Sequence, residues 1–482
     1  MLFPLLCLIF YDYIMRSGTI FSIAALYDSQ ITGTNEGGTI MENISKAVPH
    51  FMGMKYVEVP SFPELLPWEI DNWQEESMSW KETCYVHAGI SGNWFRVSGP
   101  DAQELLSYMA INNVFKWKIG SSKHLVFCDE QGYILNHKLT IREAEDSFRI
   151  MGANSPVPIQ TTIEQKGFDA KLEIVQGFVY QISGPLSLTV IEKLTGEDQR
   201  DLKFLRTKMI KIPGLDGEYE LARIGMSGTL AYEIRGKMED GIPVYEKIYE
   251  AGQPYGMKRL GWRTYTVNHT EGGYPQSGCS FVPTFMIDPN LIDENDNMNP
   301  YVAGLMGWSG SVELTNYRAR LRTPGEVNWL WMANFDHDFV GKEALLKEKE
   351  SPKRQIVTLV WNKEDIIDVF SSLFEKGEPY KFMDFPNLCN FNTAGHQDYV
   401  TTPDGKVIGY ASAGHYSYYY REVISETVID IDQAEIGNEV IVQWGDAGKR
   451  IKNIRARVER YPYLDLPSNK DYDLDTVPKG YE

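Results

Sequence analysis

The segment Gly225-Met226-Ser227-Gly228-Thr229-Leu230-Ala231-Tyr232-Glu233-Ile234-Arg235-Gly236 places a glycine-rich turn directly before a short strand. The strand carries one carboxylate, Glu233, between two apolar neighbours. A carboxylate that leaves water costs free energy unless hydrogen-bond donors satisfy it. Glu233 therefore either points to solvent or accepts hydrogen bonds from a bidentate donor such as the N–C–N edge of a pterin.

The composition is that of a globular chain with an acidic surface. The 482 residues suffice for two or three packed domains, and a hydrophobic content of 43% is typical of globular proteins. The formal net charge of −19 disfavours a nucleic-acid partner, because a phosphate-binding surface needs clustered Lys and Arg. The five cysteines form no CxxC or Cys/His cluster, which indicates neither a zinc site nor a disulfide framework and favours a cytoplasmic location.

The amino terminus carries a short apolar run, Leu2–Tyr11, which Pro4 interrupts and Asp12 closes. It is shorter than the about 20 apolar residues that span a bilayer. It also lacks the basic flank and the small-residue cleavage site of a secretory signal. Met41 opens a more ordinary start, so we expect residues 1–45 to be an N-terminal extension outside the functional domain, and we expect no membrane partner. A signal-anchor is the alternative.

A strand, a Ser-Gly-Pro turn and an amphipathic helix follow one another at two places. The first place begins with Asn93–Val97 and turns at Ser98–Pro100, after which apolar residues recur at helical spacing. The second turns at Ser183–Pro185 and continues into a similar pattern over residues 190–194. The recurrence predicts an internal pseudo-repeat, with two unrelated strand-to-helix turns as the alternative.

The character of the chain changes after residue 275. Residues 275–322 are rich in Asn, Asp, Pro and Gly, which predicts a long surface excursion, and such loops often cover active sites. Beyond about Glu350, short apolar strands with glycine turns predict a small β-barrel or sandwich. The strand segments are 356–361, 405–410, 423–431 and 440–444. The Asp-, Pro- and Lys-rich tail after Tyr463 is expected to fray.

Three further groups of segments, taken with the segment around Glu233, resemble one enzyme family. They are Arg263–Tyr274, Phe335–Leu345, and the set Val357–Asn362, Tyr380–Phe382, Gly405–Ser417 and Gly437. Their order and spacing resemble those of the tetrahydrofolate-dependent aryl O-demethylases that act on vanillate and syringate. These enzymes are a branch of the aminomethyltransferase (glycine cleavage T-protein) superfamily. The resemblance runs from about Trp80 to Tyr463.

The resemblance implies an α+β fold in consecutive parts. A T-protein-like folate- and substrate-binding domain, built from related β-α modules, would span residues 46–350. A small C-terminal β-barrel domain would span residues 351–465, and residues 466–482 would form a tail. The family implies tetrahydrofolate as the acceptor of the methyl group, and no metal.

The resemblance also assigns roles to three residues. Tyr265 matches the tyrosine that these demethylases place at the methoxy group, where a phenolic O–H with a pKa of about 10 can hydrogen-bond or protonate the departing oxygen. Glu233 matches the carboxylate that binds the pterin, with the ligand as its expected partner. Tyr274 stands where the relatives have a tryptophan that packs on the pterin, so an aromatic plane is kept. Tyr265 is the predicted catalytic residue, and Glu233 and Tyr274 are the predicted cofactor-binding residues.

The substrate side departs from the family pattern. Gly132–His137 lacks the paired aspartates of the glycine cleavage enzymes, which disfavours aminomethyl transfer. Ala153 stands where the vanillate-type enzymes have an arginine for the substrate carboxylate, and Ala88–Ser91 replaces a Gln and a His. We therefore do not expect vanillate to be the substrate.

Three histidines in the matched segments, His87, His137 and His269, are predicted to line the substrate cavity instead. A purely structural role is the alternative for each of them. Their spacing is too wide to favour a metal site.

The predicted function is tetrahydrofolate-dependent demethylation of a small methoxy compound, with an aromatic compound favoured. The products would be 5-methyltetrahydrofolate and a hydroxylated compound. The alternatives are demethylation of an aliphatic S- or N-methyl compound and folate binding without catalysis. The sequence leaves a monomer and a homodimer open.

Overall fold

The computed structural model describes residues 47–49, 54–57, 65–88, 91–151, 156–388 and 395–482. The predicted N-terminal extension 1–45 and Ala153 lie outside the described residues.

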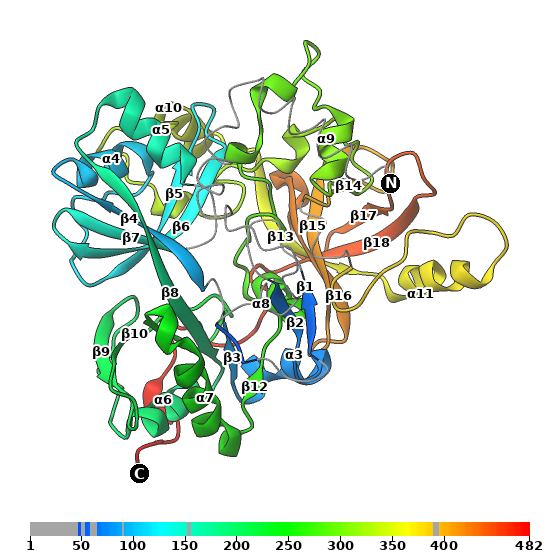
Figure 1. The fold of residues 1–482 in the computed structure, drawn as a ribbon. Coiled ribbons are helices and arrows are strands. Elements are labelled where there is room, and N and C mark those ends of the chain that lie inside the picture. The colour runs from blue at the N-terminus through cyan, green and yellow to red at the C-terminus, as the bar shows by residue number, and fades with distance from the viewer. Residues whose placement is uncertain (1–46, 50–53, 58–64, 89–90, 152–155, 389–394) are drawn as a thin grey trace, which may run out of the picture.

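Strand β8 (Lys171–Ser183) crosses the middle of the molecule and joins two halves of one ten-stranded sheet (Figure 1). Its first half pairs with β4 (Gly92–Ser98). Its second half pairs with β3 (Tyr85–His87) on one side and β11 (Ala231–Gly236) on the other. One long strand therefore fixes the positions of three partners.

The two halves of the sheet repeat one arrangement. In the first half the strand order is β5 (Ser122–Cys128), β6 (Ile134–Ala144), β7 (Ser147–Met151), β4. In the second half it is β9 (Thr207–Lys211), β10 (Glu218–Ala222), β11, β8. Along the chain, each half runs from its innermost strand through a helix and three antiparallel strands to a second helix. The predicted internal repeat is therefore confirmed.

The Ser-Gly-Pro turns that open the two halves share one backbone conformation. Gly99 has a φ of 132° and Gly184 a φ of 128°, values that favour glycine. A Cβ added to Gly99 would lie 2.7 Å from the carbonyl oxygen of Asp169, and one added to Gly184 would lie 2.5 Å from that of Thr83. Both conformation and space therefore require glycine, which is why the turn recurs in the sequence.

Two helices cover each half of the sheet (Figure 1). The first half has α4 (Ala102–Met109) and α5 (Val157–Lys166), and the second has α6 (Ser187–Thr195) and α7 (Gly241–Gly252). Each half has an apolar core of its own, with buried members such as Val97, Leu105 and Phe148 in the first and Tyr180, Leu188 and Ile234 in the second.

The C-terminal region contains a closed barrel, as predicted. Its strands, in order around the barrel, are β13 (Arg354–Trp361), β16 (Glu422–Asp430), β15 (Val407–Ser417), β14 (Asp398–Thr401), β17 (Glu439–Trp444) and β18 (Lys452–Glu459). Helix α10 (Lys342–Glu350) precedes β13, and α11 (Lys363–Ser371) follows it. Four predicted strand segments fall within or overlap β13, β15, β16 and β17. The boundary near Glu350 stays a prediction.

Helix α8 (Trp262–Gly272) lies between the sheet and the barrel (Figure 1). Its Asn268 side chain donates to the Tyr85 hydroxyl on β3 at 3.0 Å, and its Thr266 hydroxyl lies 3.0 Å from the His415 ring on β15. Around it lie four shorter elements, β1 (Lys55–Val57), β2 (Leu66–Glu69), α3 (Trp73–Glu82) and β12 (Lys258–Arg259). One helix thus contacts both parts of the fold.

Residues 275–322 form an irregular segment, as expected, with short 3₁₀ turns and one helix, α9 (Pro300–Leu305). The segment is not only a surface excursion, because it has a small apolar core of its own that includes Val282, Met298, Ala303 and Trp308. It also contacts the barrel through the backbone of Ser311, whose N–H donates to Asp398 at 2.9 Å.

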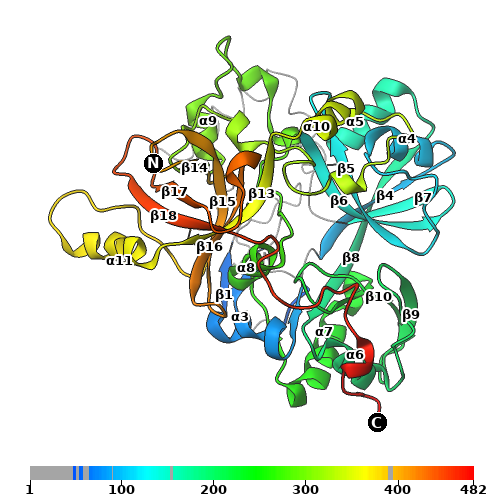
Figure 2. The ribbon, with the colours of Figure 1, turned by 180° about the vertical axis from the view of Figure 1, so that it is seen from behind.

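The C-terminal tail does not fray, so that expectation is wrong. After β18 the chain crosses from the barrel to helix α6 in the second half of the sheet (Figure 2). Val477 is 5% exposed within the core of that half, and the Thr189 hydroxyl donates to the Pro478 carbonyl at 2.6 Å. Asn469 donates to the Ala231 carbonyl at 2.8 Å. The charged and polar composition of the tail suggested a free end. A few of its side chains, such as Val477 and Asn469, nevertheless bind it to the second half of the sheet.

None of the helices within the described ranges is both long and apolar enough to cross a membrane.

Candidate active site

Three side chains form one row across the sheet at the centre of the molecule. His87 on β3 and Glu233 on β11 both lie opposite Gln181 of β8 in the strand registers. All three side chains are buried. Because neighbouring residues in register point to the same face of a sheet, the row brings an imidazole, an amide and a carboxylate together.

Glu233 has partners within the protein. Its Oε2 accepts hydrogen bonds from Arg235 Nε at 3.0 Å and Nη2 at 2.6 Å, because residues two apart on a strand share a face. Arg235 is fully buried and also donates to Glu220 at 2.6 Å. Among the described residues, the second carboxylate oxygen, Oε1, has one long contact, at 3.4 Å from Gln181 Nε2. The expectation that the ligand is the partner of Glu233 is therefore incomplete, because Arg235 already binds Oε2. Oε1 can still accept a hydrogen bond from a ligand.

Tyr265 reaches this row from helix α8. Its ring stacks on His87, with ring centroids 4.1 Å apart and planes 16° from parallel. Its hydroxyl lies 3.5 Å from Gln181 Nε2, the same nitrogen that approaches Glu233. Burial raises the pKa of Tyr265 far above its usual value, with a further contribution from Tyr85, so its hydroxyl stays a proton donor at neutral pH.

His87 and His269 have the same hydrogen-bonding pattern. His87 Nδ1 lies 2.8 Å from the Leu260 carbonyl, and His269 Nδ1 lies 2.9 Å from the Tyr274 carbonyl. A carbonyl only accepts, so Nδ1 carries the proton in each ring. Burial lowers the pKa of both residues to about 4. Each Nε2 is therefore a lone-pair acceptor, and both are buried without a hydrogen-bond partner in the described part of the chain.

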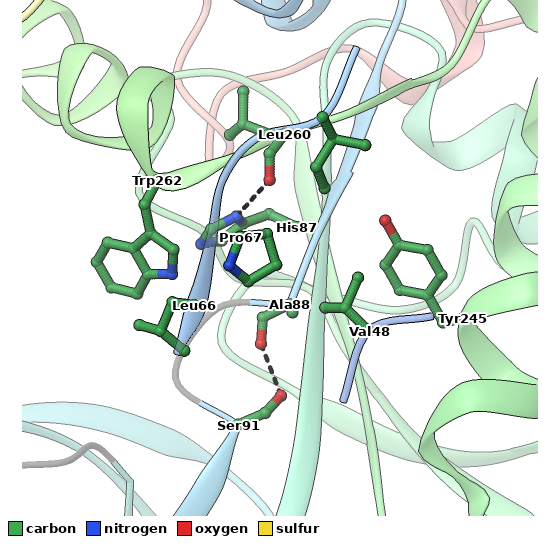
Figure 3. A pocket seen from close by; sticks show the side chains of 10 residues that line it. Val48, Leu66, Pro67, His87, Ala88, Ser91, Tyr245, Leu260 and Trp262 are labelled. Carbon is green, nitrogen blue, oxygen red and sulfur yellow. Dashed lines mark hydrogen bonds between the residues drawn. The ribbon is translucent and has the colours of Figure 1, made fainter. Parts of the chain in front are cut away.

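A small pocket adjoins His87 (Figure 3). Most of the residues that line it have apolar side chains, among them Leu66 of β2, Tyr245 of α7, Leu260, and Trp262 at the start of α8. Figure 3 shows the His87 ring held by its bond to the Leu260 carbonyl. This arrangement is consistent with the predicted placement of His87 beside a cavity.

A second group of aromatic side chains surrounds Tyr274, just after the end of α8. The Tyr274 hydroxyl lies 3.0 Å from His137 Nε2, which lies 3.0 Å from His124 Nδ1. Trp329 packs on the His137 ring with centroids 4.5 Å apart. His269 links this group to Tyr265, since its ring contacts Tyr265 at 4.9 Å and Tyr274 at 6.1 Å.

The two histidines of this group are neutral at physiological pH. Burial, with a smaller contribution from the Arg235 charge, lowers the pKa of His124 to about 4. Burial and the neighbouring His124 hold the pKa of His137 well below its usual value. Burial likewise raises the pKa of Tyr274 well above its usual value.

All six predicted site residues therefore lie in one connected set of contacts. Sequence reasoning missed four others: Gln181, Arg235, His124 and Trp329. Arg235 was detectable, because a strand places it beside Glu233. To find His124, one would have needed to know how β5 pairs with β6, which brings it beside His137. No sequence pattern near Trp329 indicates its role. The roles assigned to the predicted residues stay predictions.

Comparison with known proteins decides the family. The GCVT N-terminal domain family matches residues 49–285. Sesamin methylene transferase from Sinomonas sp. (strain No.22) is 35% identical over 430 residues, which cover 86% of this chain and 94% of that protein. The chain belongs to the GCVT family.

Two other proteins similar to this chain extend this result. Syringate O-demethylase from Sphingobium sp. (strain NBRC 103272 / SYK-6) is 26% identical over 396 residues, which cover 79% of this chain and 84% of that protein. The crystal structure of the glycine cleavage system aminomethyltransferase T from Bartonella henselae superposes with a TM-score of 0.62 at 16% identity, covering 87% of this chain and 96% of that one. The predicted fold class is therefore confirmed, and so is the predicted tetrahydrofolate-dependent one-carbon transferase of the GCVT family.

The interior of this GCVT family member suits tetrahydrofolate. A pterin presents adjacent N–H donors and ring acceptors, and Glu233 Oε1 and His269 Nε2 offer lone pairs while Gln181 Nε2 offers a donor. Glu233 and Tyr274 would hold the pterin by hydrogen bonds and ring contact. Among the residues that the structure describes, no three His, Cys, Asp or Glu side chains gather into a group that could hold a metal ion.

Proposed function

We propose that this protein transfers a one-carbon unit from the oxygen of an aryl ether to tetrahydrofolate and releases a phenol. The observation that carries the proposal is the Tyr265 hydroxyl. It is buried and protonated, lies beside the Gln181–Glu233 pair, and belongs to a ring that His87 holds by stacking.

In this reaction, Glu233 and Tyr265 would have different roles. Tetrahydrofolate, when bound, supplies the nucleophilic nitrogen. Glu233 accepts hydrogen bonds from the pterin and orients it. Tyr265 donates a hydrogen bond to the ether oxygen, whose negative charge grows as the carbon–oxygen bond breaks. A fixed donor in a buried site stabilises such charge more than water does, since the local dielectric is low.

Aromatic walls support an aromatic substrate. Trp262 contacts Tyr265 edge-on with centroids 5.0 Å apart, and Trp329 contacts Tyr274 at 5.7 Å. Flat rings pack well in such surroundings. A methoxyarene would be the donor of a methyl group, in keeping with the O-demethylase among the relatives.

A second candidate donor is a methylenedioxyarene, in which one CH₂ bridges two phenolic oxygens. The observation that favours it is the higher identity to the methylene transferase, 35% against 26% for the O-demethylase. The product would then be 5,10-methylenetetrahydrofolate and a catechol.

One experiment separates these donors. Purified protein is incubated with tetrahydrofolate and a panel of methoxyarenes, methylenedioxyarenes, sulfonium compounds and methylamines, and the folate products are quantified by mass spectrometry. We expect a one-carbon folate only with aryl ethers. Release of formaldehyde without tetrahydrofolate, or turnover of only the aliphatic compounds, would contradict the proposal.

We also propose that the protein acts in the cytoplasm, without a metal and without a nucleic-acid partner. The net charge of −19 and the scattered cysteines support this. Metal analysis of the active protein, together with activity after chelation, tests the metal-free part of the proposal.

A further inference from the structure

His269 lies where two groups of the candidate site meet. It follows Tyr265 by one turn of helix α8, so the two side chains share a face of the helix. Its ring centroid is 4.9 Å from that of Tyr265 and 6.1 Å from that of Tyr274. His269 therefore lies between the proposed donor to the ether oxygen and the ring proposed to pack on the pterin.

The hydrogen bonds of His269 leave one ring atom available for a ligand. Nδ1 donates to the Tyr274 carbonyl at 2.9 Å, which fixes the tautomer, so Nε2 carries a lone pair and no hydrogen. The residue is 3% exposed, and burial lowers its pKa to about 4, so Nε2 stays unprotonated at neutral pH. Nε2 has no hydrogen-bond partner among the described residues. Such a buried acceptor is satisfied by a ligand that brings an N–H or O–H donor.

Tetrahydrofolate brings such a donor at its reacting nitrogen. N5 of tetrahydrofolate is a secondary amine with one N–H, whereas N5 of dihydrofolate and of folate has a lone pair and no hydrogen. Both candidate products, 5-methyltetrahydrofolate and 5,10-methylenetetrahydrofolate, carry carbon in place of that hydrogen. An acceptor beside N5 therefore distinguishes the substrate from its products and from its oxidised forms.

The proposed reaction brings N5 close to His269. This nitrogen has to approach the carbon that leaves the ether oxygen, and Tyr265 donates to that oxygen. The ring that contains N5 packs on Tyr274. His87, the other histidine with an unpartnered Nε2, stacks flat on Tyr265, whereas His269 meets Tyr265 at an interplanar angle of 77° and reaches Tyr274 as well.

We propose that His269 Nε2 accepts a hydrogen bond from the N5–H of tetrahydrofolate and makes the site selective for reduced folate without a one-carbon unit. This inference rests on the proposed function and deepens it, because it assigns selection of the carbon acceptor to one side chain. It places His269 on the folate rather than in the cavity for the ether. When N5 takes up carbon, its proton leaves for the phenol product, so the bond is lost and the folate product binds less tightly.

The test measures binding rather than turnover. Calorimetry compares tetrahydrofolate with 5-deazatetrahydrofolate, in which a CH₂ group replaces N5–H. We expect the parent protein to bind tetrahydrofolate about tenfold more tightly, the effect of one hydrogen bond. His269→Asn places an amide N–H near the position of Nδ1, which keeps the bond to the Tyr274 carbonyl, and removes the Nε2 acceptor. In this variant the two affinities should become equal, through weaker binding of tetrahydrofolate alone.

Two further variants separate the acceptor from the structural role of the ring. His269→Gln carries an amide oxygen that can accept near the position of Nε2, so it should restore part of the preference for tetrahydrofolate. His87→Asn makes the same change at the histidine with the same hydrogen-bonding pattern, and it should leave the ratio of the two affinities at the parent value. Thermal unfolding of each variant verifies that the fold is kept.

Each contrary result decides a different point. Equal affinity of the parent protein for the two ligands overturns the role of His269 without any variant, and leaves the proposed function intact. A preference for tetrahydrofolate that persists in His269→Asn, or that disappears in His87→Asn, assigns the N5–H to another residue and also overturns it. If neither ligand binds, the proposed function fails together with this inference.

Discussion

The ring of Tyr265 lies on the ring of His87, with centroids 4.1 Å apart and planes 16° from parallel. The contact joins helix α8 to strand β3, and the two residues are 178 positions apart in the sequence (265 − 87). His87 is itself fixed by the Leu260 carbonyl, so the Tyr265 hydroxyl has little freedom to move away from Gln181.

This placement makes Tyr265→Phe the most direct test of the mechanism. The change keeps the stacked ring and removes the donor, so kcat should fall by about 10²–10⁴-fold while folate affinity is preserved. The deficit should shrink for substrates with electron-withdrawing ring substituents, since their phenolates leave with less help. Steady-state kinetics over a substituent series provides the measurement. The same deficit for good and poor leaving groups would make Tyr265 a pocket wall.

Glu233→Ala should weaken both folate binding and the fold. Loss of a hydrogen bond to a charged group should lower folate affinity by about 1.5–3 kcal/mol. The buried Arg235 then keeps its ion pair with Glu220, so the free energy of unfolding should fall by about 1–3 kcal/mol, below the full cost of breaking a buried ion pair. Calorimetry and chemical denaturation measure the two effects.

The double change Glu233→Leu with Arg235→Met is the control for stability. Because it removes both charges, it should recover stability but not folate binding. A double variant as unstable as Glu233→Ala would show that the ion pair is not the cause.

The tail contact predicts a stability effect far from the site. Val477→Ala removes two methyl groups from the core beside α6 and should lower the free energy of unfolding by about 1–3 kcal/mol. Lys479→Ala, an exposed change in the same segment, should have little effect. Thermal unfolding of the two variants side by side distinguishes a docked tail from a free one.

The buried Glu426 of the barrel predicts a pH effect. It accepts hydrogen bonds from Ser280 and from Tyr461, and burial raises its pKa to about 7 from an unfolded value of 4.5. Between these values the folded state holds a proton that the unfolded state has lost, so this contribution to stability is complete below pH 4.5 and declines up to pH 7. Glu426→Gln should flatten that decline and be relatively more stable at pH 8, as denaturation at several pH values would show. If the pH dependence of stability is the same in Glu426→Gln and the parent protein, Glu426 is ionised in the folded protein and its pKa is not raised.

Sequence patterns predicted the parts of the fold that depend on local geometry. The Ser-Gly-Pro turns revealed the repeat because Gly99 and Gly184 need a backbone that only glycine adopts easily. Short apolar strands separated by glycine turns likewise predicted a small barrel or sandwich, and the structure has the barrel. Contacts between distant segments were not predictable in this way. The burial of Val477 depends on helix α6, and the stacking of His87 on Tyr265 depends on how α8 enters the sheet.

The residues of the candidate site likewise fall into those that the sequence predicted and those that only the fold brings together. Glu233, Tyr265 and Tyr274 were found because a family pattern marks them. His124 was missed because nothing near it in the sequence marks it, and only the pairing of β5 with β6 brings it to His137. Gln181 was missed for the same reason, since its importance comes from the strands on both sides of it.

The return of the tail to helix α6 also has a consequence for how the protein is made. When a ribosome has synthesised only the residues up to the barrel, the second half of the sheet lacks Val477, the backbone around Pro478 and the N–H of Gly480 that bonds Glu192. Its core remains open to water until this late segment emerges. A nascent chain that stalls before residue 477 would therefore expose apolar surface to chaperones and proteases, whereas a chain that reaches it closes its own earlier half.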